Sequence, residues 1–308
     1  MELIRTPMLL LAVALATAAC SGGEPASSGA TGQSSSQVAA ASPATPGATM
    51  PSPATTQQSS QPTKKPPVKL DPKEQQRLNQ ELIEAAWDND LRRAESLILR
   101  GADVNAKDNT VQSAYLISTS EGYLELLELT LQHGADVDSK DSFNGTGLIR
   151  AADRGHADIV GRLVQADIKI NHINNLGWTA LHEAIILGDG SRRYVDTVRV
   201  LLAAGADLRL RSQRDQIAPL QHATSKGHDE IAQVLRAGLE ADKPSKQLAN
   251  QWLLAAADRG DATAAALALR AGADLESRDQ RGRTPLMLAI TNDRPEVARL
   301  LRYLGADP

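Results

Sequence analysis

Short amphipathic segments separated by glycine-containing turns recur along the chain from about residue 71 onward. In residues 198–202 and 297–301, apolar side chains stand three and four positions apart, with a charged residue between them. This spacing places the apolar side chains on one face of an α-helix. A glycine follows shortly after each run, and glycine adopts the left-handed conformation that closes a helix without strain. The pattern therefore predicts short helices that each pack through one face.

The tripeptide Gly-Ala-Asp marks the ends of these segments at a regular period. It begins at Gly101, Gly134, Gly205, Gly272 and Gly305. The first two copies and the last two copies are 33 residues apart, whereas the gaps of 71 and 67 residues each have room for one degenerate repeat. Such self-similarity is typical of repeat proteins, in which each unit packs on its neighbours.

A second landmark predicts another helix in each repeat. Residues 179–184 read Thr-Ala-Leu-His-Glu-Ala, residues 284–289 are a close variant, and residues 218–223 are a looser one. Thr284 is suited to cap a helix through its hydroxyl, and Pro285 suits the first helical position, where its missing N–H has no cost. Each repeat should therefore contain two helices.

These landmarks together resemble the ankyrin repeat, a turn followed by two antiparallel helices, and the resemblance extends over residues 71–308. It implies an all-α ankyrin-repeat solenoid. The first repeat has no recognisable hairpin and should be a polar cap, with Leu78, Leu82, Ala85 and Ala86 turned inward. About seven repeats are expected, at approximately 75–105, 106–138, 139–171, 172–209, 210–240, 246–276 and 277–308.

Composition and charge agree with a helical interaction domain. Hydrophobic residues make up 42% of the chain but aromatic residues only 3%, which favours a Leu, Ala, Ile and Val core between helices over a β-sandwich. The formal net charge is -4, and because residues 1–70 carry +2, residues 71–308 carry -6. Since nucleic-acid binding depends on clustered Lys and Arg, this balance argues against a nucleic-acid partner.

Residues 1–19 have the features of an export signal. Arg5 precedes an apolar run at 8–16, and small residues lead up to Cys20, the only cysteine of the chain. The apolar run is shorter than the roughly 20 residues that a membrane span needs. The segment resembles the lipobox of bacterial lipoproteins, although Thr17 stands where that family usually has Leu. The resemblance implies lipidation of Cys20, and Ser21 points to the outer membrane; ordinary cleavage to a soluble periplasmic product is the alternative.

Residues 20–70 are rich in Ser, Ala, Pro and Gln and contain few large apolar residues. Such a segment cannot bury enough apolar surface to offset the entropy of ordering, so a disordered linker is expected. A flexible chain of this length has ends on the order of 40 Å apart. The repeats should therefore face the periplasm from a membrane anchor.

Motifs for chemistry are lacking in the sequence. It has no phosphate-binding glycine loop, no zinc-binding His-Glu-x-x-His pair and no nucleophile elbow. We expect no enzyme activity, no cofactor and no metal. The repeat phase assigns structural roles to the histidines, and the family resemblance implies that His182 bonds the neighbouring turn. The six histidines are His133, His156, His172, His182, His222 and His228.

The resemblance implies binding through hairpin tips and the concave face of the first helices. The fourth repeat combines Trp178, Ile186 and Leu187 with an insertion near residues 189–194. These apolar residues could form an interface with the insertion or simply pack beneath it. The candidate residues for partner binding are Trp178, Ile186, Leu187, Arg192, Arg193 and Tyr194, then Phe143 and Leu176 near hairpin tips, and Trp87 on the first repeat.

The sequence thus favours a non-catalytic module that is tethered in the bacterial cell envelope and binds a protein, rather than a nucleic acid or a small molecule. Similarity to exported bacterial ankyrin proteins implies an accessory role in catalase-type stress defence or in neutralising a toxin. The alternative is a secreted effector that binds host proteins, which an anchor at Cys20 disfavours.

Overall fold

The computed structural model describes residues 70–242 and 244–307. The predicted signal at 1–19, the lipidation site Cys20 and almost all of the predicted linker at 20–70 lie outside the described residues. Within the described ranges the chain is helical, with one isolated β-bridge between Lys140 and Thr146. The helices are α1 Pro72–Trp87, α2 Leu91–Leu99, α3 Ala114–Glu121, α4 Leu124–Gln132, α5 Gly147–Arg154, α6 Ala157–Gln165, α7 Ala180–Ile186, α8 Arg192–Ala203, α9 Pro219–Ser225, α10 Asp229–Glu240, α11 Lys246–Arg259, α12 Ala262–Arg270, α13 Pro285–Thr291 and α14 Pro295–Tyr303.

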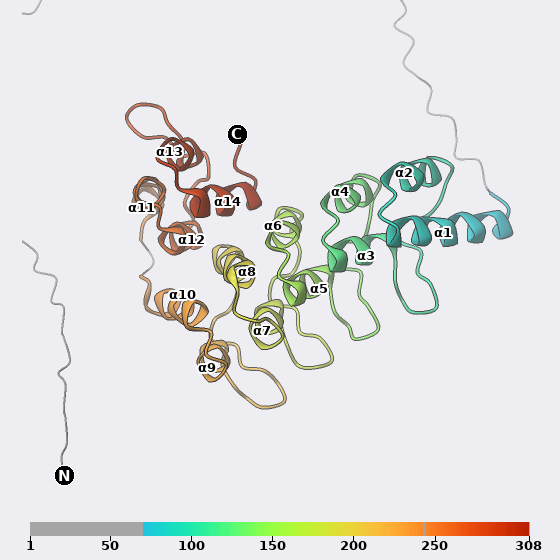
Figure 1. Ribbon diagram of the computed structural model, residues 1–308, viewed down its shortest axis with the longest axis horizontal. Helices are drawn as coiled ribbons and strands as arrows, with labels where there is room; N and C mark the ends of the chain where they lie inside the picture. The colour runs from blue at the N-terminus through green and yellow to red at the C-terminus, as the bar shows by residue number, and fades with distance from the viewer. Residues whose placement is uncertain (1–69, 243, 308) are drawn as a thin grey trace, which may run out of the picture. The chain divides into compact units, whose positions relative to one another are not determined.

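Consecutive helices form seven antiparallel pairs, which confirms the predicted all-α repeat (Figure 1). In the first repeat, Leu78, Leu82, Ala85 and Ala86 are buried, as the pattern predicted. We call the odd-numbered helices the first helices and the even-numbered helices the second helices. The first helices α1, α3, α5, α7 and α9, with the loops between the repeats, make one side of the first five repeats, which we call the first-helix face (Figure 1).

Local sequence explains where these helices begin and end. The Thr284 hydroxyl accepts a hydrogen bond from the Met287 backbone N–H at 3.2 Å, and Pro285 takes the first position of α13. Gly205 follows the end of α8 with a φ of 90°, a conformation that costs residues with a Cβ atom free energy. The predicted caps and stops are therefore present.

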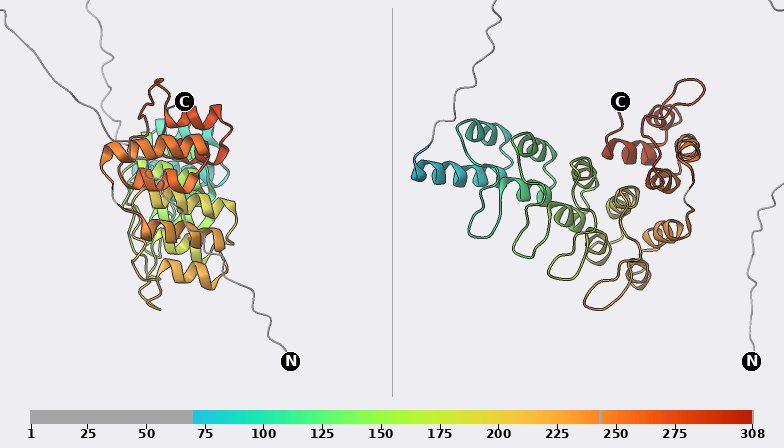
Figure 2. Two further views of the ribbon diagram at one scale, coloured as in Figure 1. Left: turned by 90° about the vertical axis from the view of Figure 1, so that its left-hand side faces the viewer. Right: turned by 180° about the vertical axis from the view of Figure 1, so that it is seen from behind.

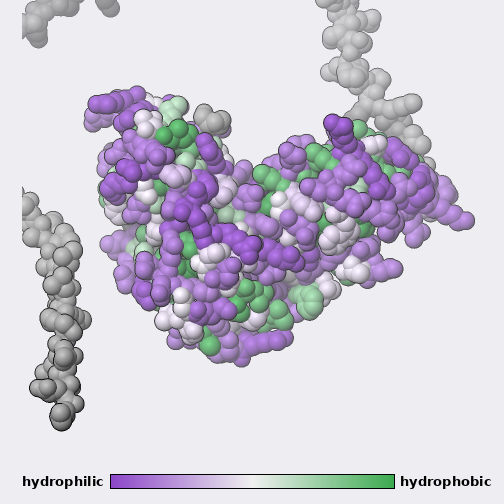
Figure 3. Space-filling view, viewed as in Figure 1, coloured by the Kyte–Doolittle hydropathy of each residue, from purple (hydrophilic) through white to green (hydrophobic). Residues whose placement is uncertain are grey.

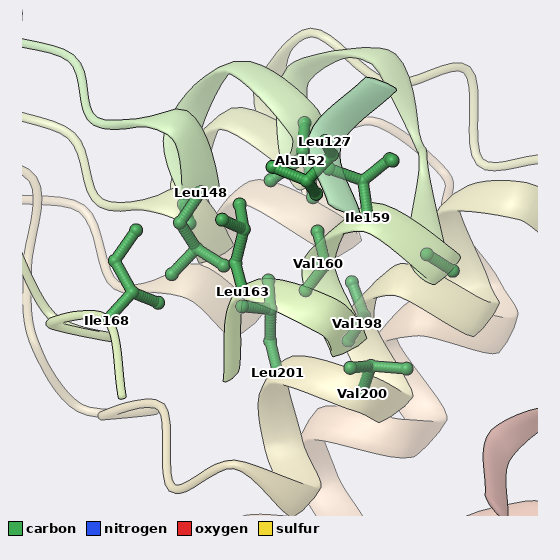
Figure 4. Packing of buried hydrophobic residues seen from close by; sticks show 14 of the residues in the cluster. Leu127, Leu148, Ala152, Ile159, Val160, Leu163, Ile168, Val198, Val200 and Leu201 are labelled. Carbon is green, nitrogen blue, oxygen red and sulfur yellow. The ribbon is translucent and has the colours of Figure 1, made fainter. Parts of the chain in front are cut away.

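The core lies between the rows of helices. Figure 4 shows Leu127 of α4 beside Ala152 of α5, and Leu163 of α6 beside Leu201 of α8, and each is buried. Burying one such side chain contributes about 1.5 to 3 kcal/mol to stability. Because each helix has one apolar face, successive pairs must cover one another, and the core is continuous through the array.

The repeats do not all stack in chain order. First helices pack side by side from α1 to α9 and again from α11 to α13, but α9 and α11 do not pack in this way. Instead, α12 packs on α8, and α14 packs on α6 and α8 (Figure 1). The sixth and seventh repeats thus fold back over the second helices of the third and fourth repeats, a difference from uniform stacking of seven repeats.

Polar side chains explain why the fifth repeat accepts no sixth repeat on its open side. Every exposed side chain of α9 and α10 is polar or charged, as in the capping repeats that end other repeat arrays. A further repeat would have to desolvate these groups. The exposed residues are Gln221, Thr224, Ser225, Asp229, Glu230, Gln233, Arg236 and Glu240.

Close backbone contact fastens the last helix to the third repeat. A Cβ atom on Gly161 of α6 would lie 2.1 Å from the Tyr303 carbonyl oxygen, so only glycine permits this approach. The Gln165 side-chain amide donates to the same carbonyl at 2.9 Å. On the neighbouring helix α12, Arg270 donates to the carbonyls of Leu202 and Ala206 at 3.1 and 2.9 Å. These bonds satisfy one carbonyl in the last turn of α8 and one in the turn that follows it.

An ion-pair network joins α8 to α10 and α14. The Arg199 guanidinium is 2.9 Å from Glu230, 3.3 Å from Glu296 and 3.4 Å from Asp196, and Arg199 is only 7% exposed. Arg299 of α14 also pairs with Asp196, at 3.3 Å. The network therefore compensates the cost of burying Arg199 between the second helices.

The fold-back leaves the first-helix face open. The loops that precede α3, α5, α7 and α9 project away from α11–α14 (Figure 2). In the view of Figure 3, the surface is mostly hydrophilic, with small hydrophobic groups between polar ones. Across residues 70–242 and 244–307, no helix is both long enough and apolar enough to cross a membrane.

Candidate functional site

A hollow of about 220 Å³ opens on the first-helix face between the third and fourth repeats. Helices α5 and α7 and the loops before them supply most of its lining. Its apolar rim consists of Phe143, Leu176 and Leu187. We call this feature the repeat 3–4 hollow. It brings together three of the predicted partner-binding residues.

Side-chain hydrogen bonds to the backbone set the conformation of the two loops that carry Phe143 and Leu176, two of the three rim residues. The Asp141 carboxylate accepts from the backbone N–H groups of Phe143 and Gly145 at 2.8 and 2.7 Å. In the next repeat, the Asn174 side chain accepts from the N–H groups of Leu176 and Trp178, both at 3.0 Å. Asp and Asn favour such turns because a short side chain mimics a backbone acceptor. The backbone at Phe143 is therefore fixed, while its side chain is 60% exposed. Leu187, at the end of α7, is 51% exposed.

The wall of the hollow is charged. Glu183 of α7 is only 4% exposed, and its Oε1 accepts a hydrogen bond from the Asn174 side-chain amide at 2.7 Å. Burial raises the pKa of Glu183 to about 7, against the opposing effect of the Asn174 hydrogen bond, and the nearby carboxylates of Asp153 and Asp141 raise it further. Glu183 therefore keeps its proton to a higher pH than an exposed glutamate does.

Two arginines line the same hollow, but both have other partners. The Arg150 guanidinium pairs with Asp141 at 3.0 Å and donates to the Gln112 side chain at 3.0 Å. Arg154 lies 3.5 Å from Asp153. In the part of the chain that the structure describes, no cation lies within ion-pair distance of Glu183.

Trp178 and Ile186, the other apolar candidates of the fourth repeat, are partly buried and do not line the hollow. The Trp178 indole N–H is buried and finds no acceptor among the described residues. The rim therefore draws its exposed apolar surface from Phe143 and Leu187, with Leu176 partly buried between the loops.

The insertion at residues 189–194, which includes the start of α8, makes contacts within the fold. Tyr194 is buried, and its hydroxyl donates to the Asp153 carbonyl at 2.9 Å. Arg193 lies 4.8 Å above the Tyr194 ring, and Arg192 pairs with Glu296 of α14 at 2.6 Å. These candidates are engaged within the chain. Trp87 is 46% exposed at the end of α1, apart from the hollow.

Sequence reasoning missed the charged wall. Arg150 and Glu183 stand five residues before Gly155 and Gly188, so they occupy the same position in consecutive repeats. The seventh repeat has the apolar Leu288 in the corresponding place of its first helix. The sequence could have indicated this wall, because Arg150 and Glu183 are charged at a repeat position where Leu288 is apolar.

The histidines link and cap repeats. The His156 Nε2 lies 3.1 Å from the Ser120 carbonyl oxygen, and the His172 Nε2 lies 2.8 Å from that of Asn144. His182 instead accepts from the backbone N–H of its own cap residue, Thr179, and lies beside the Ile217 backbone of the next turn. Among the residues described, His, Cys, Asp and Glu side chains form no group that could hold a metal ion.

Comparison with known families agrees with the helix pairs and the loops that precede them. The family described as "Ankyrin repeats (3 copies)" matches residues 82–173, 115–212 and 220–308. The chain belongs to the ankyrin-repeat family. Ankyrin repeats are typically non-catalytic protein-interaction modules.

Bacterial ankyrin-repeat proteins are among the relatives. The chain is 38% identical over 142 residues to the ankyrin repeat protein YahD of Escherichia coli (strain K12), a match that covers 46% of this chain and 70% of YahD. It is 36% identical to an ankyrin repeat-containing protein of Treponema pallidum (strain Nichols), covering 37% of this chain and 38% of that protein. A solved ankyrin repeat domain from Acinetobacter baumannii AYE is 49% identical, covers 51% of this chain and 80% of that chain, and has a TM-score of 0.49.

Proposed function

We propose that this ankyrin-repeat protein is a non-catalytic module that binds a protein partner through the first-helix face and the tips of its loops, the first helices and hairpin tips that were expected from the sequence to bind. The observation that carries the proposal is the repeat 3–4 hollow, where Phe143 and Leu187 remain exposed on a fixed backbone. Large apolar side chains around a recess are typical of interaction hot spots. The fold-back of α11–α14 supports the choice of face because it covers the second helices α6 and α8 of the third and fourth repeats and leaves their first helices, α5 and α7, free.

The proposal places the module in the bacterial cell envelope, anchored through a lipid on Cys20 and facing the periplasm, with the outer membrane favoured over the inner one. Its support is the sequence of residues 1–21 and the composition of the linker. Tethering would raise the effective concentration of the repeats toward a partner in the same compartment. The finer roles, catalase-type stress defence or toxin neutralisation, rest on resemblance alone, and a secreted effector that binds host proteins is the alternative.

A crosslinking capture from cell-envelope fractions tests the proposal. The tagged native chain is compared with Phe143→Ser/Leu187→Ser, which removes the exposed rim without removing a buried side chain. Leu99→Ser is the matched control, because Leu99 is 72% exposed on a second helix. We expect one protein to be captured by the native chain and the control, and its yield to fall at least about tenfold with the double variant.

Capture that is equal for all three chains would place the binding surface elsewhere. Recovery of no protein at all would contradict the protein-binding role itself. Circular dichroism of the double variant, expected to match the native spectrum, separates loss of binding from loss of fold.

A further inference from the structure

We infer that the repeat 3–4 hollow receives a single basic side chain, lysine or arginine, of the partner, whose charge pairs with Glu183 while its aliphatic stem lies along Phe143, Leu176 and Leu187. The inference rests on the proposed function, because it names the chemistry by which the same surface recognises its protein partner. The occupant follows from the charges, the burial and the size of the hollow.

The charges of the hollow are incomplete by one cation. Three carboxylates line it, those of Asp141, Asp153 and Glu183, together with the guanidinium groups of Arg150 and Arg154. Arg150 is bound to Asp141, and Arg154 lies beside Asp153. Glu183 is therefore the carboxyl for which the described residues provide no opposite charge.

Because Glu183 is buried, its lack of a counter-charge costs free energy. Glu183 is 4% exposed, and one of its oxygens is already occupied by the Asn174 amide at 2.7 Å. Ionising a buried carboxyl without a counter-charge costs free energy. This cost agrees with the raised pKa of Glu183, about 7. A cation that enters the hollow replaces the lost hydration and stabilises the ionised form.

The size of the hollow selects a side chain rather than a helix or a small fold. A space of about 220 Å³ holds one long side chain. Its apolar rim and acidic wall match the two parts of lysine and arginine, whose stems prefer apolar surface while the charged end seeks a carboxylate. An acidic side chain of a partner would be repelled by the three carboxylates, and both arginines already pair with carboxylates of the hollow.

Selection of peptides tests the inference without knowledge of the partner. A phage-displayed library of random linear peptides is selected separately on the native chain, on Glu183→Gln and on Glu95→Gln. Glutamine keeps the size of the side chain and an oxygen that can accept the Asn174 hydrogen bond. Glu95 is an exposed carboxylate of α2 and serves as the matched control. The labelled peptides that emerge are then titrated by fluorescence anisotropy.

We expect peptides selected on the native chain and on Glu95→Gln to share one lysine or arginine beside apolar residues. Replacing that residue by glutamine should weaken binding to the native chain at least about tenfold, and Glu183→Gln should weaken the unaltered peptide by a similar factor. The two changes together should weaken binding little more than either one alone, because they remove the same ion pair.

Two results would overturn the inference, and they differ in what they say about the proposed function. In the first, the peptides lose binding to Phe143→Ser/Leu187→Ser but share no basic residue, or they bind Glu183→Gln unchanged. This result would contradict the inference of a basic side chain but would still support the proposed binding surface. Peptides that bind the double variant as tightly as the native chain, or no enrichment at all, would count against the surface and the inference together.

Discussion

Two neighbouring side chains of α7, His182 and Glu183, are buried, and burial shifts their pKa values in opposite directions. Burial lowers the pKa of His182 to about 4 and raises that of Glu183 to about 7, because burial disfavours the charged form of each group. His182 is therefore neutral in the folded protein, with its Nδ1 accepting from the Thr179 backbone N–H. Glu183 keeps a proton to much higher pH than an exposed glutamate does.

These shifts predict how stability depends on pH. Between pH 4.5 and about 7, the folded chain holds the Glu183 proton that the unfolded chain has lost, so this group's contribution to stability falls as the pH rises. His182 acts in the opposite direction between about 4 and 6.5, since only the unfolded chain is protonated there. The two effects partly cancel in the native protein.

Glu183→Gln should remove one of the two effects. We compare the free energy of unfolding of the native chain with that of Glu183→Gln at each pH. The native value minus the variant value should fall by on the order of 3 kcal/mol between a pH below 4.5 and a pH above the folded pKa of about 7. Urea unfolding of both chains across this range measures the difference. A difference that does not change with pH would show that Glu183 titrates normally.

Single-residue features were predictable from sequence where the cause is local. Thr284 caps α13 and Pro285 begins it because both effects involve only the backbone nearby. The surroundings of Glu183 were not predictable, because its burial and its lack of a cation depend on how the third repeat packs beside the fourth. Its position in the Thr-Ala-Leu-His-Glu-Ala landmark gave only the helix.

Among the helices, α8 packs against many others. It packs against α6, α7, α10, α12 and α14, and it is 12 residues long, whereas α2, α4 and α6 have nine each. The insertion that the sequence suggested as part of a patch starts this helix and supplies Arg192 to Glu296. Sequence periodicity located the helix correctly but could not show which neighbours cover its outer side.

Arg199→Ala tests how α8 holds the last two repeats. The substitution leaves Asp196, Glu230 and Glu296 close together without their shared cation, and we expect it to cost about 2 kcal/mol, less than a fully buried pair because Glu230 is largely exposed. Hydrogen exchange should accelerate in α12 and α14, while α3 and α5 keep their protection. Arg236→Ala, at an exposed site on α10, is the matched control and should change neither. Unchanged exchange in α12 and α14 after Arg199→Ala would mean that the network does not fasten them.

At the scale of the whole molecule, the number of repeats was predictable but their order of packing was not. The Gly-Ala-Asp period counts the helix pairs, and it does so because each pair ends in the same turn. The apolar stripe of α12 shows that one face is buried, yet it does not say whether α10 or α8 covers that face. The fold-back depends on Gly161 and on the polar side of α9 and α10, which become informative only in three dimensions.

This packing predicts that damage in the middle spreads toward the C-terminal repeats. Leu201→Asp puts a carboxylate into a fully buried site on α8 and should cost more than about 4 kcal/mol. Hydrogen exchange should lose protection in α6–α10, α12 and α14, with α1 and α2 least affected. Leu99→Asp, at an exposed leucine, is the control. A melting temperature of Leu201→Asp within a few degrees of the native value would contradict this packing.

Which face binds is tested most directly by photocrosslinking in intact cells. A photoreactive benzophenone residue replaces either Phe143, on the rim of the repeat 3–4 hollow, or Leu99, which is even more exposed to solvent on a second helix. Binding through the first-helix face predicts one discrete adduct from position 143 and none from position 99. An adduct from position 99 alone, or none from position 143, would contradict it.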